Sequence, residues 1–213
     1  VGGDSTTARL VATTPIAFMI FGGYLGNLVD RINSQHDSLQ SLMAVVQKQS
    51  SIDEATGVFN RRHLFGEIEK EIARSARYGH PLSGMMVDLD RFKDVNDRHG
   101  HPAGDLLLKS IAVALQKSVR AIDTVGRYGG DEFIVLMPEC KPEGAAAAAE
   151  RVLRHVRECR VPDHPHLPGV SVSIGVATFP NAKNLSQGLF LAAVDGALLR
   201  AKSSGKNRIY QAK

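Results

Sequence analysis

The pattern of apolar and polar positions divides the chain into three parts. In the first part, positions 10–29 carry no charged side chain and are mostly apolar. A helix rises about 1.5 Å per residue, so this segment is long enough to cross a hydrocarbon core of about 30 Å. We predict that residues 1–29 are the end of a transmembrane region and that 10–29 is its last helix. A buried or interfacial helix is the alternative.

The hydrophobic period changes after residue 29. Between Leu25 and Gln49, apolar and Gln side chains recur at alternating steps of three and four residues. This spacing is typical of the heptad seam of a coiled coil. We predict a helical stalk over 30–52 that pairs two copies of the chain in parallel. A single amphipathic helix lying on the following domain is the alternative.

Residues 53–213 have the length of one domain and alternate between helix-like and strand-like patterns. The paired glycines Gly129 and Gly130 indicate a tight turn between two strands. A central hairpin within alternating elements predicts an α/β fold of the α+β type with a mixed central sheet. The predicted helices span 62–78, 103–119, 144–159 and 185–203, and the predicted strands span 82–88, 124–128, 132–137, 170–179 and 208–210.

Composition narrows the class of protein. The chain is 43% hydrophobic and 23% charged, which excludes wholesale disorder. Its two cysteines, Cys140 and Cys159, form no CxxC pattern, so a disulfide scaffold or a cysteine zinc site is not expected. The net charge of +4 comes without a basic run, and aromatic residues make up only 6%. We therefore expect no nucleic-acid partner and attribute the basic residues to a small anionic ligand.

Acidic residues stand at the ends of predicted strands. Asp88 ends an apolar strand, and Asp131 with Glu132 follows the paired glycines. If that hairpin lies beside the strand, the carboxylates meet at one edge and suit Mg²⁺ shared with a phosphate. Acidic residues at such places are also commonly solvated caps, and Asp90 is predicted to cap the helix that begins at Arg91.

Five blocks of sequence, in order, give these acids a context. RYGGDEF stands at 127–133, and DEATGVFNRR stands at 53–62. The stretch 81–105 reads PLSGMMVDLDRFKDVNDRHGHPAGD, and SIGVA and AKSSGKNR follow at 173–177 and 201–208. Together these blocks resemble the GGDEF family, the bacterial diguanylate cyclases. The resemblance covers nearly all of residues 53–210.

The resemblance implies a fold, a reaction and partners. The fold is similar to the palm of nucleotide cyclases and polymerases, with a five-stranded sheet wrapped by helices. Two domains in a homodimer each bind one GTP and together form cyclic di-GMP and two pyrophosphates. Two Mg²⁺ per active site are implied, with Mn²⁺ as the alternative. Together with the predicted membrane segment, the resemblance implies a protein of the bacterial inner membrane whose catalytic domain lies in the cytoplasm.

The resemblance also implies a role for each matching residue. The metal ligands are Asp88, the main-chain carbonyl of Leu89, Asp131 and Glu132. Asp131 is the first choice for the base that deprotonates the 3′-hydroxyl, with Glu132 beside it and Lys93 adding charge. The implied substrate-binding residues are Phe92 and Lys93 for phosphate, Asn96 and Asp105 for guanine, and Lys202 and Lys206 for the outer phosphates. The family usually has Arg where Lys206 stands, so bidentate contact is lost there.

A product site is implied as well. Arg120-Ala-Ile-Asp123 resembles the family's RxxD inhibitory motif. Arg151 is a weaker candidate for the secondary half of that site, contributed by a neighbouring domain. The alternative function is a catalytically silent module that binds cyclic di-GMP through Arg120 and Asp123, and a plain GTP-binding scaffold is a third option. Both alternatives are disfavoured because the matching site residues are intact, namely Asp88, Asp131, Glu132, Asn96 and Asp105.

Overall fold

The computed structural model describes residues 25–26, 28–29, 31–33, 35, 51–161, 164, 167 and 169–212. The chain separates into two compact units, Val1–Ser50 and Ser51–Lys213. The predicted transmembrane segment 10–29 and the predicted stalk 30–52 lie largely outside the described residues. Within the part of the chain that is described, no helix is long and apolar enough to cross a membrane.

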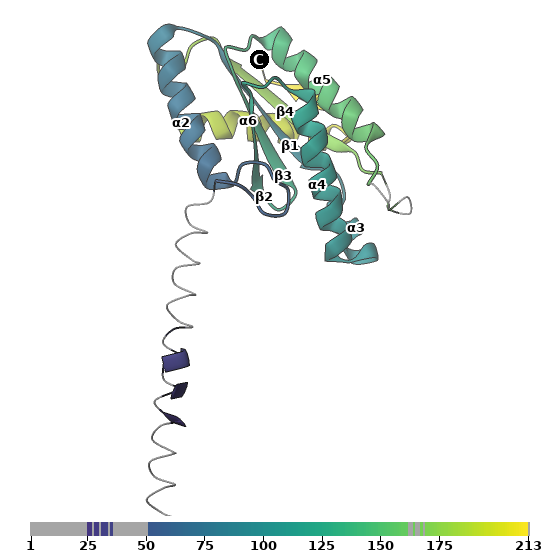
Figure 1. The fold of residues 1–213 in the computed structure, drawn as a ribbon. Helices are drawn as coiled ribbons and strands as arrows, with labels where there is room; N and C mark the ends of the chain where they lie inside the picture. The colour runs from purple at the N-terminus through teal and green to yellow at the C-terminus, as the bar shows by residue number, and fades with distance from the viewer. Residues whose placement is uncertain are drawn as a thin grey trace, which may run out of the picture. The chain divides into compact units, whose positions relative to one another are not determined.

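The second unit is built around one five-stranded sheet (Figure 1). The strand order is β2-β3-β1-β4-β5, and every neighbouring pair is antiparallel except β4 with β5. This arrangement confirms the predicted mixed sheet. The strands are β1 (Leu82–Leu89), β2 (Thr124–Gly129), β3 (Glu132–Pro138), β4 (Val172–Phe179) and β5 (Ile209–Gln211).

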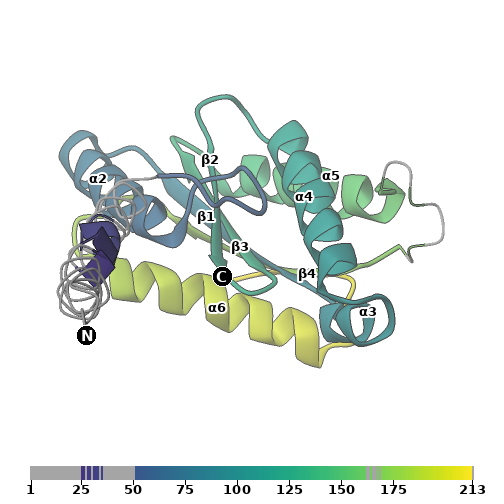
Figure 2. The same ribbon diagram turned by 60° about the horizontal axis from the view of Figure 1, so that its bottom comes forward.

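Helices cover both faces of the sheet (Figure 2). On one face lie α4 (His101–Ser118) and α5 (Pro142–Glu158), and on the other lie α2 (Arg61–Tyr78) and α6 (Gln187–Ser203). The short helix α3 (Phe92–His99) follows β1 closely. The helices and strands agree with the predicted ones to within one or two residues at their ends.

The central strand β1 shows why the sheet has two cores. All of its positions are buried, and it carries only two strongly polar side chains, Ser83 and Asp88. Alternate residues of a strand face opposite ways. Met85 and Val87 therefore join the core under α4 and α5, while Leu82 and Met86 join the core under α2 and α6. This double burial holds the end of β1 in a fixed place.

The turn of the β2–β3 hairpin differs from the prediction by one residue. Gly129 pairs with Glu132, so Gly130 and Asp131 form the turn, rather than Gly129 and Gly130. The physical reason is an irregularity between Arg127 and Gly129, which shifts the register of the two strands. The shift places Asp131 in the turn and Glu132 as the first residue of β3.

Gly175 of β4 gives a test of this packing. A Cβ at position 175 would collide with backbone atoms of α6 at Leu198 and Val194, which cannot move separately. We expect Gly175→Ala to lower the free energy of unfolding by about 3 kcal/mol, measured by urea denaturation. Gly196→Ala in α6 is the matched control, because a Cβ there meets nothing within 4 Å. Equal stability of the two variants would contradict this account.

Candidate active site

The hairpin lies directly beside β1, as the acid pattern required. Asp88 of β1 and Glu132 of β3 are register partners. The backbone N–H of Leu89 donates to the carbonyl oxygen of Asp131, with 3.3 Å between nitrogen and oxygen. Directly opposed residues of neighbouring strands project on the same face. The carboxylates of Asp88 and Glu132 therefore share a face of the sheet, while Asp131 stands in the adjoining turn. Two segments far apart in sequence meet here.

Lys202 of α6 reaches the same edge. Its Nζ lies 2.7 Å from Asp88 Oδ2, and the Asp88 carboxyl is almost fully buried. Burial raises the pKa of Asp88, the ion pair with Lys202 opposes this rise, and the charges of Asp131 and Glu132 add to it. The net direction is upward. The edge thus holds several carboxylates that repel one another and attract positive charge.

The donors at this edge fit one kind of metal ion. In the described part of the chain, no three His, Cys, Asp or Glu side chains converge to form a ready-made metal cage. Mg²⁺, however, is usually bound by one or two carboxylates together with water and substrate phosphates. Asp88 and Glu132 on a common face, next to Asp131, supply that kind of donor set. The residues therefore suit a Mg²⁺ ion that shares its ligands with a nucleotide.

The helix pair α3–α4 brings together the predicted guanine-binding and phosphate-binding residues. The Asn96 side chain packs against Gly104, where a Cβ would overlap Asn96 Oδ1 and press on the Phe92 ring. Asn96 Oδ1 is buried and has no hydrogen-bond partner among the described residues. Such an orphaned acceptor is unfavourable unless a ligand supplies a donor. Asp105 is exposed one residue beyond Gly104, and Lys93 is exposed in the first turn of α3.

Gly104 is a site residue that the sequence analysis did not single out. The available signal was a glycine inside a helical pattern, which often marks a close approach of another group. Here the approaching group is the Asn96 amide. The lack of a side chain at 104 is what allows α3 to lie close to α4 at the candidate base pocket.

The prediction that Asp90 caps α3 is wrong. The N-cap is Arg91, which has a left-handed backbone with φ of 58° and makes no capping hydrogen bond with its side chain. The Asp90 carboxylate instead accepts from Ser171 Oγ at 2.6 Å, Ser173 Oγ at 2.7 Å and the Asn207 N–H at 3.0 Å. The Asp90 backbone N–H also donates to the Ser171 carbonyl, so the pairing of β1 with β4 extends to Asp90. The Asp90 side chain lies against the two serines and not over the start of α3.

The three predicted product-site residues gather around the end of α4. Arg120 Nη2 lies 2.8 Å from Asp123 Oδ1 and 3.0 Å from the Pro138 carbonyl oxygen. Hydrogen bonding to Asp123 raises the pKa of Arg120, so this arginine remains charged. Arg151 Nε on α5 donates to the carbonyl of Ser118, at the last residue of α4. All three side chains therefore make contacts within the chain itself.

Arg127 links the signature turn to the opening motif of the domain. Its Nη2 and Nε donate to the Gly130 carbonyl at 2.7 and 3.0 Å, and its Nη1 lies 3.2 Å from Asp53 Oδ1. Burial tends to raise the pKa of Asp53, but hydrogen bonds from Thr56 and the charge of Arg127 outweigh it and lower that pKa. Arg127 is a second residue whose role the sequence analysis did not assign.

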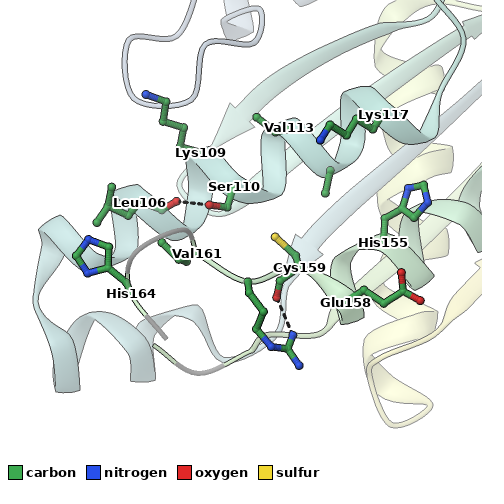
Figure 3. A pocket seen from close by; sticks show the side chains of 12 residues that line it. Leu106, Lys109, Ser110, Val113, Lys117, His155, Glu158, Cys159, Val161 and His164 are labelled. Atoms are coloured by element: carbon green, nitrogen blue, oxygen red, sulfur yellow. Dashed lines mark hydrogen bonds between the residues drawn. The ribbon is translucent and has the colours of Figure 1, made fainter. Parts of the chain in front are cut away.

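Two pockets of the domain bear on the position of the site, one near the end of β1 and one between α4 and α5. One of about 410 Å³ borders the end of β1 and is lined by Asp90, Arg91, Lys206 and Asn207 among others. A second, of about 650 Å³, lies between α4 and the end of α5, with Leu106, Val113 and Cys159 in its walls (Figure 3). None of the predicted site residues lines the second pocket.

Comparison with known proteins decides the family. Residues 50–208 match the family described as "Diguanylate cyclase, GGDEF domain", and this match spans most of the chain. The chain belongs to the GGDEF family. The resemblance drawn from the five sequence blocks is thereby confirmed at the level of the family.

Individual relatives of this GGDEF chain are moderately similar. The response regulator PleD of Caulobacter vibrioides is 36% identical over 159 residues, which are 74% of this chain and 35% of PleD. This chain therefore spans about a third of that relative. The crystal structure of diguanylate cyclase SiaD of Pseudomonas aeruginosa, in complex with its activator SiaC, superimposes with a TM-score of 0.73 at 31% identity. That match covers 97% of this chain and 79% of SiaD.

A solved GGDEF domain bound to cyclic di-GMP is also similar. This is the domain of DgcB from Caulobacter crescentus, with a TM-score of 0.71 and 26% identity. The match covers 76% of this chain and 92% of the DgcB domain. The α+β fold with a mixed central sheet is therefore that of GGDEF domains.

Gly104→Ala tests the base pocket of this GGDEF domain. The alanine Cβ would displace the Asn96 amide, which is the movable end of a side chain, so we expect little change in thermal stability. Alanine is also a better helix former than glycine by about 1 kcal/mol. With the guanine contact to Asn96 that is proposed below, binding of GTP should weaken about tenfold, since one hydrogen bond to the base is lost and the pocket narrows. Calorimetric titration and thermal unfolding on the same sample check both expectations, and unchanged GTP affinity would contradict them.

Asp88→Asn tests the electrostatics of the acidic edge. A raised pKa means that the ionised Asp88 is less favourable in the folded GGDEF domain than in the unfolded chain. Its contribution to stability therefore falls as pH rises from the ordinary value of 3.8 through the higher folded value. We expect Asp88→Asn to be more stable than wild type at neutral pH, and the difference to disappear in acid.

Urea denaturation across a pH series measures this difference. Asp97→Asn is the matched control, because Asp97 is an exposed acid on α3. A lower stability of Asp88→Asn at neutral pH would show that the ion pair with Lys202 outweighs burial, contrary to this account.

Proposed function

We propose that this chain is a diguanylate cyclase, which condenses two GTP molecules into cyclic di-GMP with release of two pyrophosphates. The observation that carries the proposal is the meeting of Asp88 with Glu132 and the Asp131 turn, from two stretches far apart in sequence. Two further observations support it: the buried Asn96 Oδ1, which has no hydrogen-bond partner among the residues that the structure describes, and the family match over residues 50–208.

The reaction needs two domains. The 3′-hydroxyl oxygen of each GTP bonds to the α-phosphorus of the other, and the bond from that phosphorus to the bridging oxygen of pyrophosphate breaks. The hydroxyl proton passes to a carboxylate, for which we propose Asp131 with Glu132 beside it. Each domain holds one GTP, so catalysis requires a homodimer whose sites face each other. Holding the two reactants in line supplies much of the rate.

Recognition of GTP is assigned to the helix pair and to α6. Asn96 and Asp105 accept from guanine N1–H and the 2-amino group, a pair of donors that adenine lacks. The N–H groups of Phe92 and Lys93 at the start of α3 bind phosphate oxygens, and the Lys93 ammonium adds charge. We also assign Lys202 and Lys206 to the outer phosphates. Lys202 then exchanges its ion pair with Asp88 for one with phosphate.

Two Mg²⁺ ions, or Mn²⁺, are assigned to each site. Asp88, the Leu89 carbonyl, Asp131 and Glu132 would hold them. Such ions stabilise negative charge on the attacking and leaving oxygens of a phosphoryl group. The acidic edge contributes by gathering charge of one sign, so that cation and nucleotide bind together.

Regulation is proposed at two levels. Cyclic di-GMP is assigned to Arg120 and Asp123, with Arg151 from a neighbouring domain, where it restrains the active arrangement. The sequence of 1–29 and 30–52 supports a transmembrane region and a helical stalk that present residues 53–213 as pairs on the cytoplasmic side of a bacterial inner membrane. An input signal then acts by shifting the packing of the stalk.

Cyclic di-GMP formation by the 213-residue chain tests this function. With GTP and Mg²⁺, we expect product detectable by chromatography, and Asp131→Ala should lower the rate at least a hundredfold, as loss of a catalytic base does.

Arg120→Ala tests the proposed product site. This variant should keep the initial rate but lose inhibition by added cyclic di-GMP. Circular dichroism of each variant controls for folding.

The alternative function predicts a different result. A dimeric wild type that binds GTP but forms no product, while it binds cyclic di-GMP through Arg120 and Asp123, would be a silent signalling module. That outcome would contradict the cyclase proposal.

A further inference from the structure

Asp90 is a buried carboxylate for which the proposed reaction has no use. The residue is only 8% exposed, and its partners are the hydroxyls of Ser171 and Ser173 and the backbone N–H of Asn207. Burying a carboxylate is unfavourable unless hydrogen bonds replace its water. Three donors converge on two oxygens here, so the charge is well satisfied.

The segment that Asp90 holds has an uncommon backbone. Gly205, Lys206 and Asn207 all have positive φ, at 118°, 61° and 49°. A left-handed backbone is strained for residues other than glycine and persists only where neighbouring groups enforce it. Two elements do so at Asn207. Asp90 accepts from its N–H, and Arg157 of α5 donates to its carbonyl and to its side-chain oxygen, each at 3.0 Å.

Lys206 therefore stands within a turn that is fixed on both sides. Its own N–H donates to the Ala201 carbonyl at 3.2 Å, which ties the turn back to the end of α6. Asn207, the next residue, is bound by Asp90 and Arg157. The Lys206 side chain is exposed and lines the 410 Å³ pocket beside the end of β1. The contacts fix the backbone and leave the ammonium group accessible.

The two acids at the end of β1 hold α6 and its following turn in different ways. Asp88 contacts the Lys202 side chain, a partly exposed ammonium that can leave for another anion. Asp90 accepts from a backbone N–H, and two serine hydroxyls donate to the same carboxylate. The second contact can persist when the first is exchanged. The turn 205–207 is therefore able to keep its position if Lys202 leaves Asp88 for a phosphate.

We propose that Asp90 is a positioning residue, whose carboxylate fixes the turn 205–207 so that Lys206 is presented to the outer phosphates of GTP. The inference rests on the proposed function, since Lys206 needs a nucleotide to act on. Asp90 touches no reacting atom and acts through the backbone of Asn207. It therefore affects nucleotide binding more than the chemical step.

Two substitutions separate the shape of this contact from its charge. Asp90→Ala removes every acceptor. Asp90→Asn keeps one oxygen for Ser171 and the Asn207 N–H, and its amide N–H can donate to Ser173, whose hydroxyl is able to rotate and accept. We expect Asp90→Ala to raise the KM for GTP about tenfold with a smaller change in kcat. Asp90→Asn should stay within about threefold of wild type in KM, because the hydrogen-bond geometry survives.

A binding measurement removes catalysis from the test. The nucleotide 3′-deoxy-GTP lacks the attacking hydroxyl, so titration calorimetry with it and Mg²⁺ reports binding alone. Asp90→Ala should bind it about tenfold more weakly than wild type. Lys206→Met should weaken binding to a similar extent, and adding Asp90→Ala to Lys206→Met should change it less than twofold, since both act through one contact. Independent, multiplying effects would overturn the proposal.

Ser83→Ala is the matched control for a merely structural role. Ser83 is fully buried on the same strand, at its other end, and its hydroxyl donates to the Cys140 carbonyl at 2.7 Å. The register partner of Ser83 on β4 is Thr178, and the register partner of Asp88 on β4 is Ser173. Ser83→Ala should lower stability without changing nucleotide affinity. Ser173→Ala, which removes one donor to Asp90, should fold and weaken nucleotide binding about threefold, and it serves if Asp90→Ala does not fold.

The outcomes distinguish this proposal from the function on which it rests. If wild type binds 3′-deoxy-GTP and Asp90→Ala binds equally well, the positioning role is overturned while the function stands. If Asp90→Asn is as impaired as Asp90→Ala, the negative charge matters rather than the turn, and the proposal is overturned too. Absence of nucleotide binding by a folded wild type would overturn both.

Discussion

A charge at the end of a strand that is buried on both faces is the constraint on which this structure depends. β1 lies at the centre of the sheet, and both Asp88 near its end and Asp90 just after it are buried. A buried carboxylate is unfavourable unless hydrogen bonds or an ion pair replace the water that it loses. The partners of these two acids come from α6 and the turn after it, and from β4. The need to satisfy two acids thus joins segments more than a hundred residues apart in the chain.

Several features of the site are unfavourable for stability. Burial raises the pKa of Asp88. Asn96 Oδ1 is buried and has no hydrogen-bond partner within the described part of the chain, and Lys206 and Asn207 have a left-handed backbone. Such features usually persist because a ligand or the surrounding structure compensates for them. The remainder of the domain is dominated by two apolar cores, and the side chains of Asn60 and Ser186 cap the N-termini of α2 and α6. The unfavourable features named above therefore lie among the residues to which ligand binding is assigned by proposal.

Three segments with proposed roles lie close together around the edge strand β2: the RxxD motif, the signature turn and the opening motif of the domain. Asp123 of the proposed product site directly precedes it, and Arg127 within it holds both the Gly130 carbonyl and Asp53. Asp53 opens the domain immediately after the first unit of the chain. The hydrogen bonds of Arg127 therefore connect the start of the domain with the signature turn, through one side chain and without an intervening helix.

The order of elements, the mixed sheet and the meeting of Asp88 with the hairpin could all be predicted from the sequence. Apolar periodicity is a local property, and the ordered motifs are specific enough to indicate a family. Asp90 could not be assigned in this way, because an acid before a helix looks like a cap, and its true partners lie at Ser171, Ser173 and Asn207. The role of Gly104 likewise depends on how closely α3 approaches α4. Hydrogen bonds and steric contacts between distant residues exist only once the sheet has formed, so only the tertiary structure shows that Asp90 binds the backbone of Asn207 while Asp88 contacts the Lys202 side chain.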